Sequence, residues 1–161
     1  MTPHQRLIEI VTAEIGVKET GGDNHGARVE EFQKAVDGKA QSESWCMAFV
    51  QWAIKLVEVQ MNVSSPIFSS EHCRTVWNNS PALRVDKPFP GCVVIWQHGN
   101  TTNGHTGVVT SVTDTNISTV EGNTSTGKGV DRNGDGVYAR IRTKTGSGEM
   151  KVIGFLDPFH V

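Results

Sequence analysis

The chain has 161 residues, of which 37% are hydrophobic and 20% are charged, and its formal net charge at pH 7 is -2. This length and composition predict a single domain over residues 1–161 with a full hydrophobic core, and they exclude disordered and collagen-like proteins. Because the sequence has no run of Lys or Arg that would follow a phosphate backbone, we expect no nucleic-acid partner.

Cysteine and histidine spacing argues against a zinc site. Cys46, Cys73 and Cys92 form no C-x-x-C motif, so neither structural zinc nor a full disulfide framework is predicted, and at least one thiol is expected to be free. The six histidines form no H-E-x-x-H motif. The first residues lack a basic region followed by an apolar one, and no segment has the length of a membrane span, so we expect a soluble protein with no membrane insertion.

Apolar residues recur at helical spacing in the first half of the chain. Thr2 and Gln5 have the spacing of a capping box, and the first helix is expected to run from there until Gly16 stops it. Ser42 or Ser44 is the expected N-cap of the third helix. The expected helices are 3–15, a short one ending at 37–38, one from about 45 to about 59, and a short one from about 70 to about 78.

The second half of the chain has the pattern of strands. Five short runs rich in β-branched and aromatic residues are separated by clusters of Gly, Asn, Asp and Thr. Helices followed by closely spaced strands predict an α+β fold, with N-terminal helices packed on a C-terminal antiparallel sheet of about five strands. The expected strands are 92–96, 107–112, 117–121, 137–142 and 151–155.

Cys46 stands just inside the start of the third expected helix. The unpaired N–H groups and partial positive charge of a helix N-terminus favour thiolate over thiol and can donate hydrogen bonds to an oxyanion. Cysteine is also among the most buried residue types, and Cys46 has the spacing to pack with Phe49 and Val50 on the core side of the helix. On this stretch alone, both the reactive and the buried interpretation stand.

His105 is the best placed of the six histidines to act as a base for that thiol. It lies in the segment GHTG at 104–107, at the head of an expected strand, where glycines leave room for the imidazole. The other histidines fall on caps, loops or a terminus and are expected at the surface. Glu121 and Asn123 are expected on one face of the next strand, where either can orient the imidazole, although an incidental polar turn fits the same residues.

Four motifs together resemble the CHAP family, the cysteine, histidine-dependent amidohydrolases/peptidases, over most of the chain. They are W-C-x-x-F-V-x-W at 45–52, P-G-x-V-V at 90–94, G-H-x-G-V-V at 104–109 and E-G-N at 121–123. The resemblance implies a papain-like fold, with Cys46 as nucleophile, His105 as general base and then acid, Glu121 orienting the imidazole, and Asn123 as an auxiliary polar group. The chain departs from the family at Cys92, where an aspartate is common, and a buried structural thiol is expected there.

The resemblance also implies a substrate and a setting. The substrate is expected to be peptidoglycan, cut at an amide bond either as an N-acetylmuramoyl-L-alanine amidase or as a peptide-crosslink endopeptidase, with loops 21–26 and 97–104 setting specificity. A single domain resembles phage endolysins, so we expect a monomer made in the host cytoplasm without a signal peptide, which acts on the wall after release or export. Two alternatives stay open: a secreted or injected antibacterial amidase effector of the same fold, and a non-catalytic, cation-stabilised wall-binding or structural module.

A second motif, D-x-N-x-D-G at 131–136, matches the opening of an EF-hand loop. It offers Asp131, Asn133 and Asp135 as side-chain ligands and the carbonyl of Val137 as a fourth, so a calcium ion is one prediction. Position 12 of the loop is Arg142 rather than a bidentate glutamate, and Asn-Gly and Asp-Gly are also strong hairpin signals, so a simple turn is the other. No organic cofactor is expected.

Overall fold

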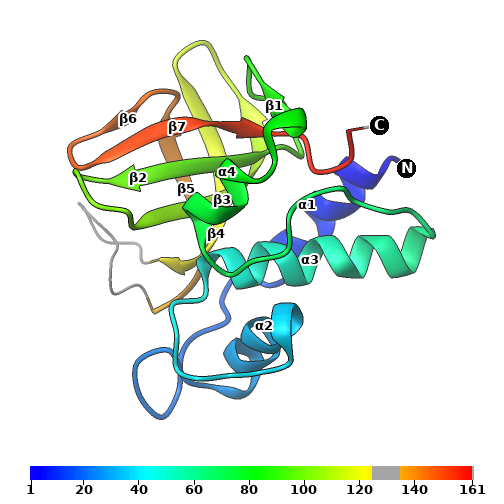
Figure 1. The fold of residues 1–161 in the computed structure, drawn as a ribbon, viewed down its shortest axis with the longest axis vertical. Coiled ribbons are helices and arrows are strands. Elements are labelled where there is room, and N and C mark those ends of the chain that lie inside the picture. Colours follow the sequence, from blue (N-terminus) through cyan, green and yellow to red (C-terminus); the bar gives the residue numbers. More distant parts are fainter. Residues whose placement is uncertain (125–134, 161) are drawn as a thin grey trace.

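The chain folds as four helices followed by an antiparallel sheet, which confirms the α+β prediction (Figure 1). The computed structural model describes residues 1–124 and 135–160. All five expected strand runs fall on the five long strands β2, β3, β4, β5 and β7. The helices are α1 (Pro3–Ala13), α2 (Ala27–Asp37), α3 (Cys46–Met61) and α4 (Cys73–Asn78), followed by a 3-10 turn at Pro81–Leu83. The strands are β1 (Arg84–Val85), β2 (Val93–His98), β3 (Gly104–Val112), β4 (Asn116–Thr124), β5 (Gly136–Thr143), β6 (Gly146–Ser147) and β7 (Met150–Leu156).

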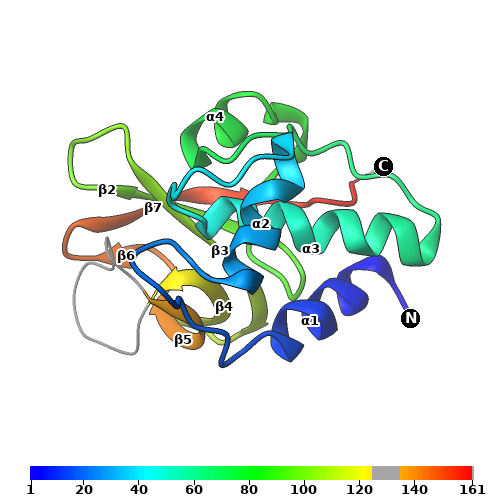
Figure 2. The same cartoon turned by 90° about the horizontal axis from the view of Figure 1, so that it is seen from below.

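The sheet has the strand order β1-β7-β2-β3-β4-β5, with β6 paired to β7, and every pairing is antiparallel. The helix α3 contacts α1 and α2 and packs against β3 and β4, so it joins the helical layer to the middle of the sheet (Figure 2). None of the helices in the described ranges is both long and apolar enough to cross a membrane.

The residues around β2 show why the strand runs are almost continuously apolar. Val93 and Ile95 belong to the core that the sheet shares with the helices, whereas Cys92, Val94 and Trp96 belong to a second apolar cluster on the other face. Side chains alternate across a strand, so a strand buried on both faces needs apolar residues at every position. The pattern at 92–96 is therefore the signature of a central strand.

The helix starts agree with the sequence at α1 and differ at α3. At α1 the capping box forms, because the Thr2 hydroxyl accepts from the N–H of Gln5 at 3.1 Å and the Gln5 side chain accepts from the N–H of Thr2 at 2.8 Å. At α3 the N-cap residue is Trp45, whose side chain makes no capping hydrogen bond. The prediction of a serine cap is wrong here, since the Ser44 hydroxyl instead accepts from the Asn123 amide at 2.7 Å.

The start of α3 is held by buried side chains rather than by a cap. Trp45 is fully buried and stacks on Phe32 of α2, with ring centroids 5.7 Å apart. The buried Gln33 amide donates to the carbonyls of Asn24 at 3.0 Å and Glu43 at 2.8 Å, and so ties the 21–26 loop to the segment before α3. A buried amide with two hydrogen bonds fixes backbone position, because breaking either bond would leave a desolvated polar group.

Candidate active site

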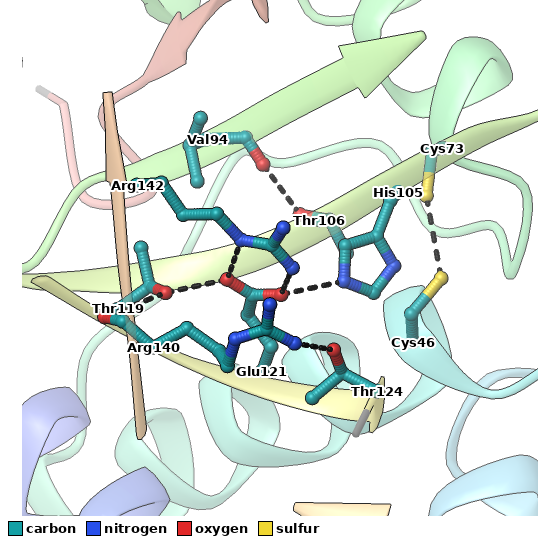
Figure 3. Close-up of polar contacts among 10 residues, drawn as sticks. All are labelled: Cys46, Cys73, Val94, His105, Thr106, Thr119, Glu121, Thr124, Arg140 and Arg142. Carbon is teal, nitrogen blue, oxygen red and sulfur yellow. Dashed lines mark hydrogen bonds and ion pairs between the residues drawn. The ribbon is translucent and has the colours of Figure 1, made fainter. Parts of the chain in front are cut away.

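Cys46 is the first residue of α3 and is 6% exposed. Its sulfur lies 3.7 Å from the sulfur of Cys73, the first residue of α4 (Figure 3). Both side chains line the same cavity, so the two helices bring their first residues together there.

His105 lies near the start of β3, with 2% of its surface exposed. Its Nε2 is 2.8 Å from a carboxylate oxygen of Glu121, and its other ring nitrogen, Nδ1, faces the Cys46 sulfur (Figure 3). The ring also stacks on Trp96, the residue paired with it on β2, at a centroid distance of 5.6 Å. The imidazole is therefore held on three sides, with the carboxylate at one nitrogen and the thiol at the other.

Two glycines beside His105 are required by close contacts rather than by the imidazole itself. A Cβ added at Gly107 would lie 2.6 Å from the Glu121 side chain, and one at Gly104 would lie 2.7 Å from the Trp96 carbonyl oxygen and 3.0 Å from the Cβ of Cys73. These distances are too short for ordinary contacts, so glycine lets Glu121 approach Gly107, and the Trp96 carbonyl and Cys73 approach Gly104, this closely.

Glu121 is fully buried on β4 and accepts hydrogen bonds from three side chains. Besides His105, Arg142 donates from Nε at 2.9 Å and from Nη2 at 2.5 Å, and the Thr119 hydroxyl donates at 2.5 Å. Burial alone would raise the pKa of the Glu121 carboxyl, but the hydrogen bonds and positive charges of Arg142 and His105 lower it to about 2. Glu121 is therefore an anion at neutral pH.

Asn123 lies beside Cys46 in the cavity rather than behind the imidazole. The strand pairing shifts register between Glu121 and Thr124, and Asn123 has a left-handed φ of 53°, so the expected alternation of Glu121 and Asn123 on one face does not continue. Its amide donates to Ser44, while its Oδ1 is buried and accepts no hydrogen bond from any described residue. Asn123 itself lines the cavity.

The charges of the thiol and the imidazole are coupled. The hydrogen bond with Cys73 lowers the pKa of the Cys46 thiol well below its ordinary value, and His105 and the N–H of Met47 add to this effect against the desolvation that burial imposes. Burial opposes protonation of His105, but its hydrogen bonds with Cys46 and Glu121, and their charges, raise the pKa of the imidazole to about 9. At neutral pH the site favours a thiolate beside an imidazolium.

Sequence reasoning missed Cys73, Thr119 and Arg142. In the sequence, Arg142 stands out only at position 12 of the EF-hand-like loop, where a glutamate is usual, and Cys73 has no predicted partner. The hydrogen bond with Cys46 and burial raise the pKa of the Cys73 thiol well above its ordinary value, so Cys73 is the protonated member of the pair. One signal was present in the sequence, since Cys73 falls in the first turn of the helix predicted from about 70 to about 78, much as Cys46 falls near the start of the third.

A cavity of about 270 Å³ opens above the cysteine and histidine side chains. The predicted loop 97–104 contributes to it, whereas the loop 21–26 does not. His98 was expected at the surface and is instead 5% exposed, because it ends a central strand at the cavity wall. Burial and the charges of Glu43 and Asp37 raise the pKa of Glu71, another lining residue, to about 7. The lining residues include Ser44, Cys46, Glu71, His72, Cys73, His98, Asn103, His105 and Asn123.

Cys92 matches the expectation of a buried structural thiol. It is fully buried in the second apolar cluster, and burial raises the pKa of its thiol to about 12. All three cysteines are free thiols.

The candidate calcium ligands are described only in part. Asp131 and Asn133 lie outside the described residues. Asp135 accepts a hydrogen bond from the Tyr138 hydroxyl at 2.7 Å, and the carbonyl of Val137 accepts from the N–H of Gly16 at 3.1 Å. Among residues 1–124 and 135–160, no group of three His, Cys, Asp or Glu side chains is arranged to hold a metal ion. The calcium site stays a prediction.

Comparison with known proteins gives one family. The family model described as CHAP domain matches residues 38–123, more than half of the chain, and this range contains Cys46, Cys73, His105, Glu121 and Asn123. No curated protein matches the chain at a significant level.

Proposed function

Because the chain belongs to the CHAP domain family, we propose that it hydrolyses an amide bond of peptidoglycan through a Cys46 thiolate. The family is one of cysteine- and histidine-dependent amidohydrolases and peptidases that act on peptidoglycan. The observation that carries the proposal is the position of the His105 ring, with the Glu121 carboxylate 2.8 Å from one nitrogen and the Cys46 sulfur facing the other. A nucleophile, a base and a group that orients the base are what acyl transfer requires.

The first step is attack of the Cys46 thiolate on the carbonyl carbon of the substrate amide. The C=O π electrons move to the oxygen, and the N–H groups at the start of α3, that of Cys46 first, donate hydrogen bonds to the oxyanion. His105 then gives its proton to the amide nitrogen, the C–N bond breaks, and the amine leaves. The product is a thioester between Cys46 and the substrate acyl group.

The second step regenerates the enzyme. His105, now neutral, takes a proton from water as the water oxygen attacks the thioester carbonyl, and the C–S bond breaks to release the acid and the Cys46 thiolate. Throughout both steps Glu121 holds the imidazole orientation and stabilises its positive charge, and Arg142 and Thr119 hold Glu121. Asn123 lines the cavity as an auxiliary polar group whose amide is fixed by its hydrogen bond to Ser44.

The cavity limits what reaches the thiolate. Its lining includes the segment 71–73 and the end of the 97–104 loop, so these two segments contact the groups that flank the scissile bond. We propose either an N-acetylmuramoyl-L-alanine amidase or a peptide-crosslink endopeptidase, acting as a monomer on the wall after release or export. The same residues serve both reactions, since each breaks an amide bond.

The test is digestion of purified peptidoglycan by the wild-type protein and by Cys46→Ala. We expect release of soluble fragments by the wild type and a loss of at least about 1000-fold in the variant, the scale seen when a nucleophile is removed. The matched control is Cys92→Ala, which removes a thiol that no step uses and should retain wild-type activity. Mass spectrometry of the fragments separates free stem peptides from cleaved crosslinks. Wild-type turnover by Cys46→Ala would exclude the mechanism.

A further inference from the structure

Two thiols meet in the candidate active site although the proposed hydrolysis uses only one. The Cys46 and Cys73 sulfurs are 3.7 Å apart, and both side chains line the cavity (Figure 3). Gly104 on β3 lies against the Cys73 side chain, where an added Cβ would be 3.0 Å from the Cβ of Cys73. Packing alone does not require a second thiol here, since a small apolar side chain would fill the same space.

The separation of the two sulfurs is a non-bonded contact that a small movement converts to a covalent bond. A disulfide needs about 2.05 Å between sulfurs, and each sulfur moves when its side chain rotates about the Cα–Cβ bond. Each cysteine is the first residue of its helix, where side chains are less restricted by a preceding turn than in the helix interior. Cys92 has no such partner, because it lies in the apolar cluster on the other face of the sheet.

We propose that Cys46 and Cys73 form a redox modification site, in which a peroxide oxidises Cys46 and Cys73 closes a reversible disulfide with it. In the first reaction the Cys46 thiolate attacks one peroxide oxygen, the O–O bond breaks, and the products are the Cys46 sulfenic acid and hydroxide. In the second, the Cys73 sulfur attacks the sulfenic sulfur, the S–O bond breaks, and the Cys73 proton leaves with the hydroxyl as water. Two thiols lose two electrons in total, and the two peroxide oxygens gain them.

The geometry suits both reactions. The cavity of about 270 Å³ is much larger than a peroxide molecule, which is only slightly larger than water. The lowered pKa of Cys46 supplies the thiolate that attacks peroxide, and Cys73 is close enough to react before a second peroxide oxidises the sulfenic acid further. That closeness protects Cys46 from the irreversible sulfinic acid.

The disulfide would switch off the proposed hydrolysis, since a Cys46 sulfur bonded to Cys73 is no longer the thiolate that attacks the amide carbonyl. Only this consequence rests on the proposed function, because the chemistry of the thiol pair needs no substrate. Thiol reductants would restore the activity by exchange.

The test treats reduced, desalted protein with hydrogen peroxide, alkylates the remaining thiols in denaturant, and maps tryptic peptides without reduction. The three cysteines fall in different tryptic peptides, 40–55, 56–74 and 85–128. We expect peptides 40–55 and 56–74 to be joined in the wild type, with Cys92 alkylated. In Cys73→Ser we expect no joined peptide and Cys46 as sulfinic acid, which reductant does not reverse. The control Cys92→Ala should form the same joined peptide as the wild type.

Activity on peptidoglycan separates this proposal from the previous one. The oxidised wild type should lose at least about 100-fold of its rate and regain it with dithiothreitol, since the nucleophile is blocked and then freed. A joined peptide from a protein that never hydrolyses peptidoglycan would refute the hydrolase and leave the redox site. Hydrolysis by the reduced wild type, with Cys46 found as sulfinic acid and no joined peptide after peroxide treatment, would refute the redox site and leave the hydrolase. If the Tm of Cys73→Ser is well below that of the wild type, the peptide map of the oxidised wild type alone tests whether the disulfide forms.

Discussion

Cys46 and Cys92 are both buried cysteines of one small protein, yet their surroundings change their chemistry in opposite directions. Cys92 lies among apolar side chains such as Val94 and Phe155, and burial raises the pKa of its thiol to about 12. Cys46 is also buried, but it meets Cys73, His105 and the start of α3, and the pKa of its thiol is lowered. Burial therefore does not decide reactivity by itself, because hydrogen bonds and nearby charge outweigh desolvation where they converge.

A chain of contacts extends this difference to the far side of the imidazole. His105 holds its proton because Cys46 and Glu121 form hydrogen bonds with it and carry negative charge, and Glu121 is an anion because Arg142 and His105 donate to it and carry positive charge. No comparable chain reaches Cys92 within the described residues. Only backbone hydrogen bonds oppose the rise in the pKa of its thiol that burial causes. If this chain of contacts sets the contrast, changes along it alter the reactivity of Cys46 and leave that of Cys92 unchanged.

The largest expected effect is on alkylation of the two thiols. At pH 6.5 and short reaction times, iodoacetamide should modify Cys46 at least about 1000-fold faster than Cys92, since only the thiolate reacts and Cys92 is protonated and buried. Peptide mapping gives the two rates in one sample, because the cysteines fall in tryptic peptides 40–55 and 85–128. Denatured protein is the control, where the rates should converge. Equal rates in the folded protein would contradict the contrast.

The next effect is on hydrolysis when the far end of the contact chain is changed. Glu121→Gln keeps the size of the side chain but removes its charge, so the imidazolium is less stable and the pKa of His105 falls. We expect the hydrolysis rate to fall by at least about 100-fold, as with other groups that orient a catalytic histidine. The pH at which Cys46 alkylation begins should rise in the same variant, which a purely structural defect would not cause. The control is Glu149→Gln, at an exposed carboxylate.

The same variant should be less stable in a way that depends on pH. Removing the anion breaks the buried ion pair between Glu121 and the Arg142 guanidinium, which is 12% exposed; this costs about 3 kcal/mol and lowers the Tm by about 6–12 °C. The pKa of Glu121 is lowered to about 2 in the folded state, so its charge stabilises the fold above the unfolded pKa, and this stability is lost as pH falls toward 2.

Thermal melts of wild type and Glu121→Gln between pH 2.5 and 7 measure this effect. The difference in Tm should be constant above about pH 5. It should shrink as pH falls below about 4, because the stabilisation that the ionised Glu121 gives the folded wild type is lost as pH falls toward its folded pKa. A difference that does not change over this range would mean that Glu121 acts through packing and not through charge.

The fold could be predicted from local sequence because its signals are local. The capping box at Thr2 and the five apolar runs each predict a structure from a few neighbouring residues, and all are present in the structure. The cap of α3 could not be predicted, because the Ser44 hydroxyl can accept a hydrogen bond either from an N–H group at the helix start or from the amide of Asn123. Asn123 lies 79 residues away along the chain. A side chain with two possible partners is assigned by tertiary packing and not by spacing.

The residues of the site that belong to sequence motifs could be predicted, and those that only tertiary structure brings to it could not. Sequence placed His105 and Glu121 on neighbouring strands, and they do meet across β3 and β4. It could not place Arg142, which reaches Glu121 from β5, the strand paired with β4, or Cys73, which reaches Cys46 from another helix. These contacts join residues whose types are common and whose spacing carries no pattern.

The smallest expected effect concerns the segment between β4 and β5, the strands that carry Glu121 and Arg142. If the D-x-N-x-D-G motif at 131–136 binds calcium, a free calcium concentration of ten times the Kd should stabilise the fold by about 1.4 kcal/mol. The Tm should then rise by about 3–6 °C, and a chelator or Asp131→Ala should remove the rise, with magnesium as the control ion. Calcium should leave the alkylation rates of Cys46 and Cys92 unchanged, since it adds stability and no charge beside either thiol. An unchanged Tm in calcium would favour the simple turn.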